Sequence, residues 1–521
     1  METDEAFAHE VEQLCSPAAF PAQGGGDVEL ITTHISWVLR GRRDVFKLKR
    51  PVRYAFVDFS SPEQRRHACE EEVRLNTRLA PDVYGGVVPV YRAQGKLSFV
   101  GPGEVVEHAV RMRRLNDADS CRERLARNAL SPEHLAALAQ RLAAFYRCAP
   151  LASAFGTPER LRALVLDNFD EIARVPEFPA PARSIARLRA HAASHLEKLL
   201  PRLDARHDGG AVRDGHGDLR LEHVYFEGDA LVPVVIDAVE FEPAFRGSDM
   251  ALDVAFFAME LEDAGRADLA AWLWSCFARA LQDYGFYPLI DTFVMYRAAV
   301  RAKVAALTAV GAPAHVRRRK RDEARRLFAL AERAGHDHHT GRPAVICVGG
   351  LVGAGKSVVA EALARAIVGP VISSDHTRKA LAGVSPDQQA APAHYTAAFS
   401  DATLQAMRAH ATLVLESHRP VVLDATFRSR AWRDEARALA TAQGVPFLFV
   451  EATCQESVLR ARLRARQARP GVSDAREAQL DDLLRTFEPL SELPAAVHLR
   501  VDTEQPLADA LAAVTARLAS G

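Results

Sequence analysis

One stretch of the sequence has the residue types and the spacing of a phosphate-binding loop. The segment GGLVGAGKS contains Gly350, four intervening residues, Gly355, Lys356 and Ser357. Backbone N–H groups of such a loop surround phosphate oxygens, the lysine reaches the β and γ phosphates, and the serine hydroxyl holds Mg²⁺. The segment follows an apolar stretch, AVICV, and opens a helical one, SVVAEALARAI, which is the context that this chemistry requires.

Charged residues beyond this loop could serve a hydroxyl acceptor. Asp375 closes the next apolar stretch, where it could accept a proton from an attacking hydroxyl as a general base. Arg378 follows about one helical turn later and could clamp an anionic acceptor. Asp424 closes a further apolar stretch, where it could bind Mg²⁺ through water or orient the acceptor-side arginine. This set predicts phosphoryl transfer to a hydroxyl.

Two arginines could close over the transferring phosphate. LRARLRARQA places Arg462 and Arg466 four residues apart, on one face of a predicted helix. Arginines in a lid neutralise the negative charge that builds up on the phosphoryl oxygens and exclude water. A helix with surface charges is the alternative, and we favour the lid.

The elements that must position these residues form an α/β pattern. Residues 343–521 alternate apolar stretches with helical ones, which predicts a parallel sheet with crossover helices. The expected strands are PAVICVGG, GPVISSD, RPVVLDATF, VPFLFVEAT and AVHLRVDT.

This segment resembles the small P-loop kinases that phosphorylate hydroxyls: polynucleotide 5′-hydroxyl kinases, zeta-toxin-like kinases and gluconate-kinase-like enzymes. The resemblance implies ATP and Mg²⁺ as cofactors, with Ser357 and Asp424 at the metal. The D-x-x-R spacing supports a hydroxyl acceptor, bound by Arg378 and Asp424, better than it supports a nucleic acid. The implied ATP-binding residues are the loop and the two arginines: Gly350, Gly353, Ala354, Gly355, Lys356, Ser357, Val358, Arg462 and Arg466.

The first part of the chain has a different pattern. Residues 25–118 are rich in predicted strands, with one helix expected over 61–81, where Ser61 is a suitable N-cap and Pro62 suits the first turn. Residues 119–335 are mostly helical. The exception is GHGDLRLEHVYFEGDALVPVVIDAVEF, which predicts a loop, a short strand, a turn and a second strand.

These two blocks resemble the aminoglycoside-phosphotransferase-like family, which has the protein-kinase fold. The implied fold class is therefore mixed: an α+β, bilobal kinase-like domain followed by an α/β P-loop kinase domain. In this resemblance Asp218 of His-Gly-Asp is the catalytic base or hydroxyl orienter, and Asp237 binds Mg²⁺ across the phosphates. Ser36, in the loop 33–38, would help to cover the nucleotide.

The resemblance also implies a lysine for the phosphates and a glutamate that pairs with it. Lys49 is our choice and Lys47 the alternative, because both have the same strand parity and alternation cannot separate them. Glu72 is the best match for the helix glutamate, with Glu70 and Glu71 as alternatives.

His223 departs from the family pattern, which has a metal-binding Asn at this position. Mg²⁺ prefers oxygen ligands, whereas imidazole suits zinc or copper. The site could lose one of two metals, carry a softer metal, or use His223 as filler. Phosphotransfer by this domain, nucleotide binding by a regulatory pseudokinase, and a structural remnant therefore all stay open.

Two further arginines suggest the charge of the acceptor in this domain. Arg297 and Arg301 share one face of a predicted helix, which indicates an anionic acceptor rather than a cationic one. Ion pairs with buried carboxylates such as Asp249 or Asp253 are an equal alternative.

Bulk properties favour a soluble globular protein of several domains. The 521 residues are 48% hydrophobic and 26% charged, with a net charge of -1, so the whole molecule is no general binder of nucleic acid or membranes. The seven cysteines have no metal-binding spacing, and an acidic N-terminus with no long apolar run indicates a cytoplasmic protein. The basic run at 317–321 could contact RNA and the His-rich linker at 336–342 could bind metal, but surface explanations are stronger for both.

The sequence thus predicts a two-module phosphotransferase. Its expected parts are an extension (1–24), the two kinase-like lobes (25–118 and 119–335), the linker (336–342) and the P-loop kinase domain (343–521). The kinase-like domain is a second kinase or a pseudokinase that regulates the first. The alternatives are a kinase of RNA or DNA 5′-hydroxyls and a non-enzymatic ATP-dependent regulator. The acceptor and the oligomeric state cannot be read from the sequence.

Overall fold

The computed structural model describes residues 4–16, 28–54, 57–336, 342–386, 388–467 and 480–520. The chain forms two compact units. Met1–Leu161 with Leu203–Phe257 make the first, and Arg162–Arg202 with Ala258–Gly521 make the second. The predicted helical block 119–335 thus contributes to both units, and the predicted domain boundaries stay a prediction.

A six-stranded antiparallel sheet dominates the start of the first unit. Its order is β1-β2-β3-β8-β6-β7. The strands are β1 (Glu29–Thr32), β2 (Ser36–Arg40), β3 (Asp44–Lys49), β6 (Tyr84–Ala93), β7 (Lys96–Ser98) and β8 (Glu104–Arg113), and a small hairpin joins β4 (Arg53–Tyr54) to β5 (Val57–Asp58). Strand β3 is hydrogen-bonded on both sides, to β2 and to β8. Its side chains therefore alternate strictly between the two faces of the sheet.

Helix α2 (Pro62–Asn76) packs against this sheet and begins where the sequence predicts. The Ser61 hydroxyl accepts a hydrogen bond from the Gln64 N–H at 3.2 Å, and the Gln64 side chain accepts one from the Ser61 N–H at 3.0 Å. This reciprocal cap satisfies two N–H groups that a helix start leaves without partners. The helix ends at Asn76, earlier than Pro81.

The rest of the first unit is helical with two short strand pairs. The predicted hairpin is formed by β10 (Val224–Phe226) and β11 (Pro233–Val235), and β9 (Val212–Asp214) pairs with β12 (Gly247–Asp249). The helices are α1 (Asp4–Gln13), α3 (Cys121–Ala126), α4 (Pro132–Cys148) and α7 (Pro243–Arg246), whereas α5 (Pro158–Arg174), α6 (Ala182–Asp208) and α8 (Met250–Asp263) have residues in both units.

The second unit contains the predicted five-stranded parallel sheet, and the expected fold class is confirmed. The order is β14-β15-β13-β16-β17. The strands are β13 (Val345–Gly349), β14 (Val371–Ser373), β15 (Val421–Asp424), β16 (Phe447–Thr453) and β17 (His498–Asp502). Every residue of β13 is buried, because helices cover both faces of a parallel sheet.

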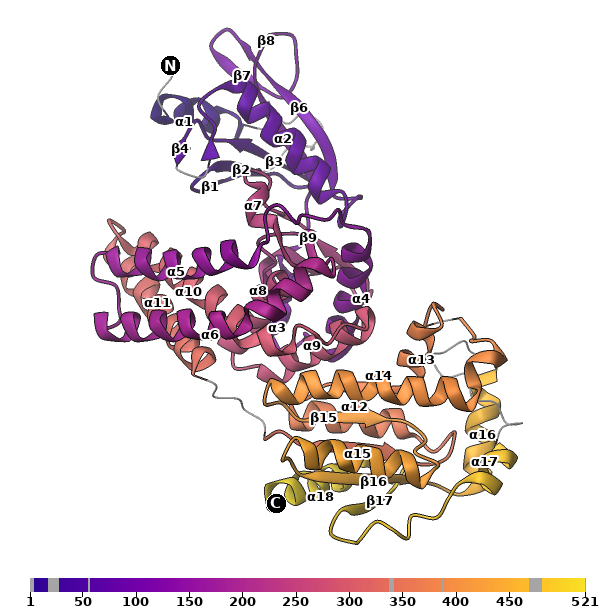
Figure 1. Ribbon diagram of the computed structural model, residues 1–521. Helices are drawn as coiled ribbons and strands as arrows, with labels where there is room; N and C mark the ends of the chain where they lie inside the picture. Colours follow the sequence, from indigo (N-terminus) through magenta and orange to yellow (C-terminus); the bar gives the residue numbers. More distant parts are fainter. Residues whose placement is uncertain are drawn as a thin grey trace. The chain divides into compact units, whose positions relative to one another are not determined.

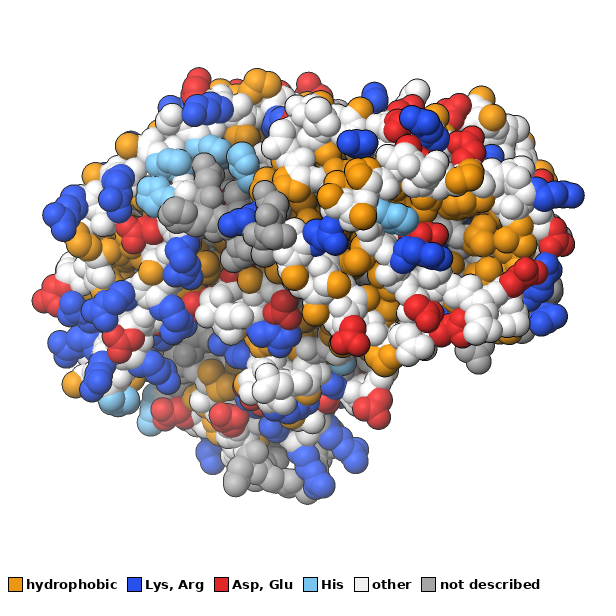
Figure 2. Space-filling view, turned by 90° about the horizontal axis from the view of Figure 1, so that it is seen from below, with side chains coloured by type: hydrophobic (Ala, Val, Ile, Leu, Met, Phe, Trp, Pro, Cys, Tyr) orange, Lys and Arg blue, Asp and Glu red, His pale blue; other side chains and the backbone are white. Residues whose placement is uncertain are grey.

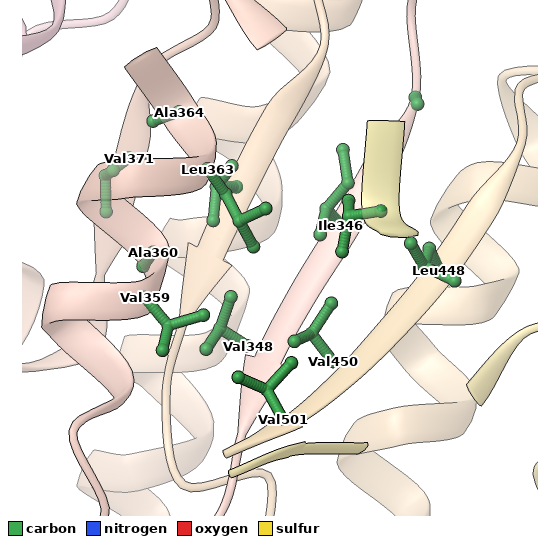
Figure 3. Close-up of a cluster of buried hydrophobic side chains, with 13 residues drawn as sticks. Ile346, Val348, Val359, Ala360, Leu363, Ala364, Val371, Leu448, Val450 and Val501 are labelled. Carbon is green, nitrogen blue, oxygen red and sulfur yellow. The ribbon is translucent and has the colours of Figure 1, made fainter. Parts of the chain in front are cut away.

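An apolar core joins the sheet to α12 (Lys356–Ile367) and α18 (Leu507–Ser520) on one face. Ile346, Val348 and Val450 of the sheet meet Val359 and Leu363 of α12, as Figure 3 shows. Each such side chain contributes about 1.5–3 kcal/mol when it leaves water. The packing therefore fixes α12 over the carboxyl end of β13, where the phosphate-binding loop lies.

Other helices complete the second unit (Figure 1). They are α9 (Ala267–Leu281), α10 (Ile290–Ala309), α11 (Ala314–Gly335), α13 (Ser374–Leu381), α14 (Ala397–Glu416), α15 (Arg430–Ala442), α16 (Glu456–Gln467) and α17 (Leu480–Thr486). None of the helices in the described part of the chain has both the length and the hydropathy that a membrane crossing needs.

Candidate active sites

The loop between β13 and α12 requires glycine at its turns. Gly353 and Gly355 have φ values of 81° and 86°, in the left-handed region that disfavours other residues. At Gly350 an added Cβ would lie 2.4 Å from the carbonyl oxygen of Ala452, which is too close for any side chain. The sequence therefore closes the loop tightly, directly ahead of the N-terminus of α12.

The lysine and the serine of this loop face inward. Lys356 Nζ donates to the Leu351 carbonyl at 2.9 Å, across the loop. Ser357 Oγ donates to Asp424 Oδ2 at 2.8 Å, so the predicted metal residues are adjacent. Ala354 is buried in the loop, whereas Val358 is exposed at the start of α12.

Asp424 lies at the end of β15 beside the loop. Burial raises the pKa of its carboxyl group to about 6, and Asp375 adds to this, whereas Lys356 and the Ser357 hydroxyl act in the opposite direction. Ser357 and Asp424 offer a hydroxyl and a carboxylate oxygen, the ligand type that Mg²⁺ prefers, so this pair fits the metal that the motif implies.

Asp375 is placed next to Asp424 by strand pairing. Ser373, two residues before Asp375, is the register partner of Asp424. Asp375 stands in the first turn of α13 and is partly exposed. The structure therefore brings the predicted base, the predicted metal carboxylate and Lys356 to one edge of the sheet.

Arg378 is held by its neighbours instead of facing open space. It is buried, and its guanidinium donates to the His394 carbonyl at 2.7 Å and to Ser400 Oγ at 3.2 Å. The guanidinium also lies 4.9 Å from the ring centre of Tyr395. The arginine links α13 to α14 and the turn before it, and its role as an acceptor clamp stays a prediction.

Arg462 fastens α16 to the loop. It donates to Thr503 Oγ1 at 2.9 Å, to the Thr503 carbonyl at 3.0 Å and to the Gly353 carbonyl at 3.4 Å. Thr503 also faces Gly355, at 3.2 Å from a Cβ built there. No sequence pattern pointed to Thr503, because a threonine after a strand is unremarkable. The side chain of Arg466 lies outside the described residues, so the lid stays a prediction.

A cavity adjoins the outer side of the loop, and the sequence did not predict it. Its volume is about 360 Å³. The loop supplies one wall, and apolar side chains of α16 and α17 with polar ones of β16 and β17 supply the others. The lining residues are Gly350, Leu351, Ala354, Glu451, Ala452, Thr453, Cys454, Leu459, Leu484, Phe487 and Arg500.

In the first unit, Asp253 holds the His-Gly-Asp turn. Its Oδ2 accepts from the His216 N–H at 2.6 Å and from the Tyr146 hydroxyl at 2.9 Å, and its Oδ1 accepts from the Gly217 N–H at 2.8 Å. A Cβ at Gly215 would lie 2.3 Å from Asp253 Oδ2. Asp253 therefore positions Asp218, a role that the sequence reasoning missed because it is a contact across the fold.

The structure separates the two candidate lysines. Lys47 Nζ lies 2.6 Å from Asp237 Oδ1 and 2.9 Å from Glu72 Oε1. Lys49 Nζ lies 2.5 Å from Glu72 Oε2 and also contacts Glu240, and Lys49 is fully buried. Of the two, Lys47 touches the predicted metal carboxylate, which favours Lys47 over our choice of Lys49, and the phosphate lysine stays a prediction.

Glu72 is the glutamate beside both lysines. Glu70 and Glu71 instead contact Arg66 and Arg74 of the same helix. Burial alone would raise the pKa of the Glu72 carboxyl group, but Lys47 and Lys49 lower it below its usual value. Burial would likewise lower the pKa of Lys47, but the carboxylates of Asp237 and Glu72 raise it well above its usual value.

Asp237 has a strained backbone. Its φ of 67° is in the left-handed region, and its N–H donates to the Tyr84 hydroxyl at 3.2 Å. Burial would raise the pKa of its carboxyl group, but Lys47 and then His223 lower it below its usual value. Strain of this kind persists only where the surroundings enforce it, and it is concentrated at functional sites.

His223 lies between the two predicted aspartates. Its Nδ1 is 2.8 Å from the Asp218 carbonyl oxygen, and its Nε2 is 3.5 Å from Asp237 Oδ2. His216 behind it bonds through Nε2 to the Ile236 carbonyl at 2.9 Å, and burial lowers the pKa of its imidazole. Asp218, Asp237 and His223 are therefore together, as predicted, with imidazole in place of an amide.

Ser36 does not lie in the covering loop. It is the first residue of β2, pairs with Lys49 across the strands, and is fully buried. The turn is closed by Thr33, whose hydroxyl donates to the Ser36 carbonyl at 2.9 Å. The expectation that the Ser36 side chain covers a nucleotide is corrected, because strand pairing turns that side chain into the fold.

Arg297 and Arg301 lie on α10, in the second unit, whereas Asp218 and Asp237 are in the first. Arg297 is buried, with its guanidinium 5.8 Å from the Tyr296 ring centre. Arg301 lies 3.7 Å from Glu323 of α11. Asp249 pairs with Arg206 and Asp253 holds the turn, and the acceptor role of the two arginines stays a prediction beside the ion-pair alternative.

Most of the predicted linker, residues 337–341, lies outside the described residues. Histidine side chains gather on the face that Figure 2 draws. Ring contacts link His191 to His195 at 5.8 Å and to His336 at 5.3 Å. Within the described ranges, no group of three His, Cys, Asp or Glu residues has an arrangement that could hold a metal ion by itself.

Comparisons with known proteins found a family model that matches part of the chain and a relative that matches most of it. Residues 345–490 match the family model described as an AAA domain. An uncharacterized protein of Mycobacterium tuberculosis is 29% identical over 466 residues, which cover 88% of this chain and 89% of that protein.

Two solved structures are also similar to parts of this chain. A gluconokinase from Sinorhizobium meliloti is 28% identical, covers 34% of this chain and 94% of its own, and has a TM-score of 0.27. A choline/ethanolamine kinase family protein from Mesorhizobium loti is 12% identical, covers 64% and 99%, and has a TM-score of 0.36. The family match confirms the predicted P-loop module.

Proposed function

We propose that this protein is an ATP-dependent phosphotransferase whose P-loop module (residues 343–521) transfers the γ-phosphate to a hydroxyl acceptor. One observation carries the proposal. Lys356, Ser357, Asp424 and Asp375 meet at the carboxyl edge of one parallel sheet. Such an edge, next to the N-terminus of a helix, is where α/β folds bind phosphorylated ligands.

Each residue of this group has a task in the proposed reaction. The loop N–H groups and Lys356 hold the phosphates, so Lys356 exchanges its bond to the Leu351 carbonyl for one to a phosphate oxygen. Asp375 accepts the proton of the acceptor hydroxyl. Mg²⁺, when held by Ser357 and Asp424, neutralises charge on the phosphates. Thr503 and Arg462 keep the loop and α16 in place.

The test is transfer by the Asp375→Asn variant. Radiolabelled ATP is offered with a panel of hydroxyl compounds: sugars, sugar acids, amino alcohols, aminoglycosides and a 5′-hydroxyl oligonucleotide. We expect the variant to lose at least about 100-fold in the rate of acceptor phosphorylation, because a general base contributes roughly 10²–10⁴-fold. The affinity for ATP should stay within about twofold, since none of the described hydrogen bonds or ion pairs joins Asp375 to the loop.

The matched control is Asp434→Asn, on the exposed surface of α15, where Asp434 pairs only with Arg430 among the contacts described. It should transfer phosphate like the wild type. Wild-type rates in Asp375→Asn would show that Asp375 is not the base. Absence of transfer by the wild type to every compound, with ATP bound, would favour a non-enzymatic regulator.

A second function, nucleotide binding by the kinase-like module (residues 25–335), is favoured by a separate observation. Lys47, Glu72 and Asp237 are joined by contacts of 2.6–2.9 Å, and the turn that carries Asp218 is held by Asp253. A remnant without function would not need to keep a lysine–carboxylate network around the buried Glu72, whose carboxylate is costly to desolvate. We propose that this module binds ATP, either as a second kinase or as a sensor for the P-loop module.

A further inference from the structure

We propose that Asp237 and His223 form a binding site for a first-row transition metal ion such as Mn²⁺, Co²⁺ or Zn²⁺, in preference to Mg²⁺. The resemblance of this module implies Mg²⁺ at Asp237, held also by an amide oxygen. Here the second ligand is an imidazole nitrogen, so the donor set does not fit an ion that prefers oxygen alone. The proposal concerns metal binding in the kinase-like module and does not depend on phosphoryl transfer by the P-loop module.

The hydrogen bonds of His223 direct a lone pair toward Asp237. The Asp218 carbonyl oxygen, 2.8 Å from Nδ1, can only accept, so the ring proton resides on Nδ1. In the neutral imidazole Nε2 then carries a lone pair. A backbone carbonyl that fixes the tautomer in this way is the usual outer contact of a metal-binding histidine.

The distance between the two donor atoms suits one small ion. Nε2 lies 3.5 Å from Asp237 Oδ2. Two ligands at about 2.0–2.1 Å from one ion at the tetrahedral angle are about 3.4 Å apart, and at a right angle about 2.9 Å apart. Without a cation or a second ring proton, a lone pair and a carboxylate oxygen would face each other unfavourably.

The described contacts of neighbouring side chains do not occupy the two proposed donor atoms, His223 Nε2 and Asp237 Oδ2. Lys47 bonds to the other oxygen of Asp237, Oδ1, at 2.6 Å. Glu222 is the other carboxylate close to Nε2, at 3.9 Å, and it pairs with Arg220 and with Arg122. The ion would therefore take two ligands from the protein and the remaining ones from water or from phosphate oxygens of a nucleotide.

An ion pair is the competing explanation. A second proton on Nε2 would make His223 an imidazolium that pairs with Asp237 without any metal. That arrangement predicts no selective uptake of transition metals, and it predicts that His223→Asn leaves metal affinity unchanged.

The test is metal binding by the full chain without nucleotide. Calorimetric titrations with Zn²⁺, Mn²⁺ and Mg²⁺, and the visible spectrum of bound Co²⁺, are compared for the wild type and His223→Asn. We expect wild-type affinity for Zn²⁺ or Co²⁺ at this site to exceed that for Mg²⁺ at least tenfold. His223→Asn should lose about 10–100-fold in Zn²⁺ and Co²⁺ affinity and keep its affinity for Mg²⁺.

Other histidines need a control, because His191, His195 and His336 also lie together. The double variant His191→Asn/His195→Asn should keep the site that His223→Asn loses. Circular dichroism checks that His223→Asn folds. If it does not fold, Asp237→Asn takes its place, and we expect that variant to lose the Zn²⁺ and Co²⁺ affinity of this site. The proposal is overturned if the wild type binds Mg²⁺ as tightly as Zn²⁺ and Co²⁺, if neither His223→Asn nor Asp237→Asn weakens binding, or if the double variant abolishes it.

Discussion

At the residue scale, the sequence indicates which chemistry is present but not which of two equivalent residues carries it. Lys47 and Lys49 have the same strand parity, so both point to the same face of β3. Their difference depends on Asp237 and Glu240, about 190 residues away in the chain. Contacts that arise only when the chain folds cannot be read from local spacing. The same reason explains why Asp253 was missed.

Substitution of the two lysines should give opposite results. Lys47→Ala is expected to abolish nucleotide binding in the kinase-like module with a modest effect on stability, because Lys47 contacts the partly exposed Asp237 and is itself not fully buried. Lys49→Ala should destabilise the protein by about 3–5 kcal/mol, because it leaves Glu72 and Glu240 buried with less compensating charge. Urea unfolding and calorimetric ATP titration measure both. If the two variants changed ATP affinity and stability to the same extent, Lys47 and Lys49 would not have the different roles that we assign to them.

At the scale of elements, most of the secondary structure could be predicted. The cap Ser61–Gln64 and the apolar strands around the loop are local signals, and the structure contains α2 and all five strands. The contacts that satisfy the edge strand of this sheet could not be predicted. Strand β14 is at the edge, yet the Val371 N–H donates to Ser275 Oγ at 3.2 Å and the Val371 carbonyl accepts from the Tyr284 hydroxyl at 3.3 Å. Side chains from and just beyond α9 thus satisfy the strand that leads to Asp375.

Removing these hydroxyls should therefore disturb the acceptor side. We expect Ser275→Ala or Tyr284→Phe to cost about 1–3 kcal/mol, because each leaves a backbone group of β14 without a partner. The transfer rate should fall while the KM for ATP stays unchanged, since the phosphate loop is not touched. Thr412→Ala removes an exposed helical hydroxyl and is the control. If stability fell but the phosphoryl-transfer rate did not change, the contacts from α9 would not support the acceptor site.

At the scale of the whole molecule, a charged cluster ties α8 and α10 to the strand that carries Asp424. Arg419, just before β15, makes a bidentate pair with Asp291 at 2.6 and 3.1 Å. Burial raises the pKa of the nearby Glu262 to about 7, with Asp291 adding to the effect and Arg419 and Arg333 opposing it. The sequence shows no pattern for this cluster, because its members come from four separate segments of the chain.

This shift predicts how stability depends on pH. A carboxyl group whose pKa is raised on folding favours the folded state below its ordinary pKa, and this contribution is lost as the pH rises through about 7. The stability of Glu262→Gln relative to the wild type should therefore rise by about 2 kcal/mol between pH 5.5 and pH 8.5. Thermal unfolding at the two pH values measures the difference. A relative stability that does not rise between the two pH values would contradict this reading.

The central claim is that one chain carries two nucleotide sites of unrelated design. Calorimetry of ATP binding, with Mg²⁺ and Mn²⁺ both present, tests it most directly on the wild type, Lys356→Ala and Lys47→Ala. We predict two sites per chain in the wild type, with a different one lost in each variant. A single site that is lost only in Lys356→Ala would contradict the claim and leave the His-Gly-Asp module without a nucleotide.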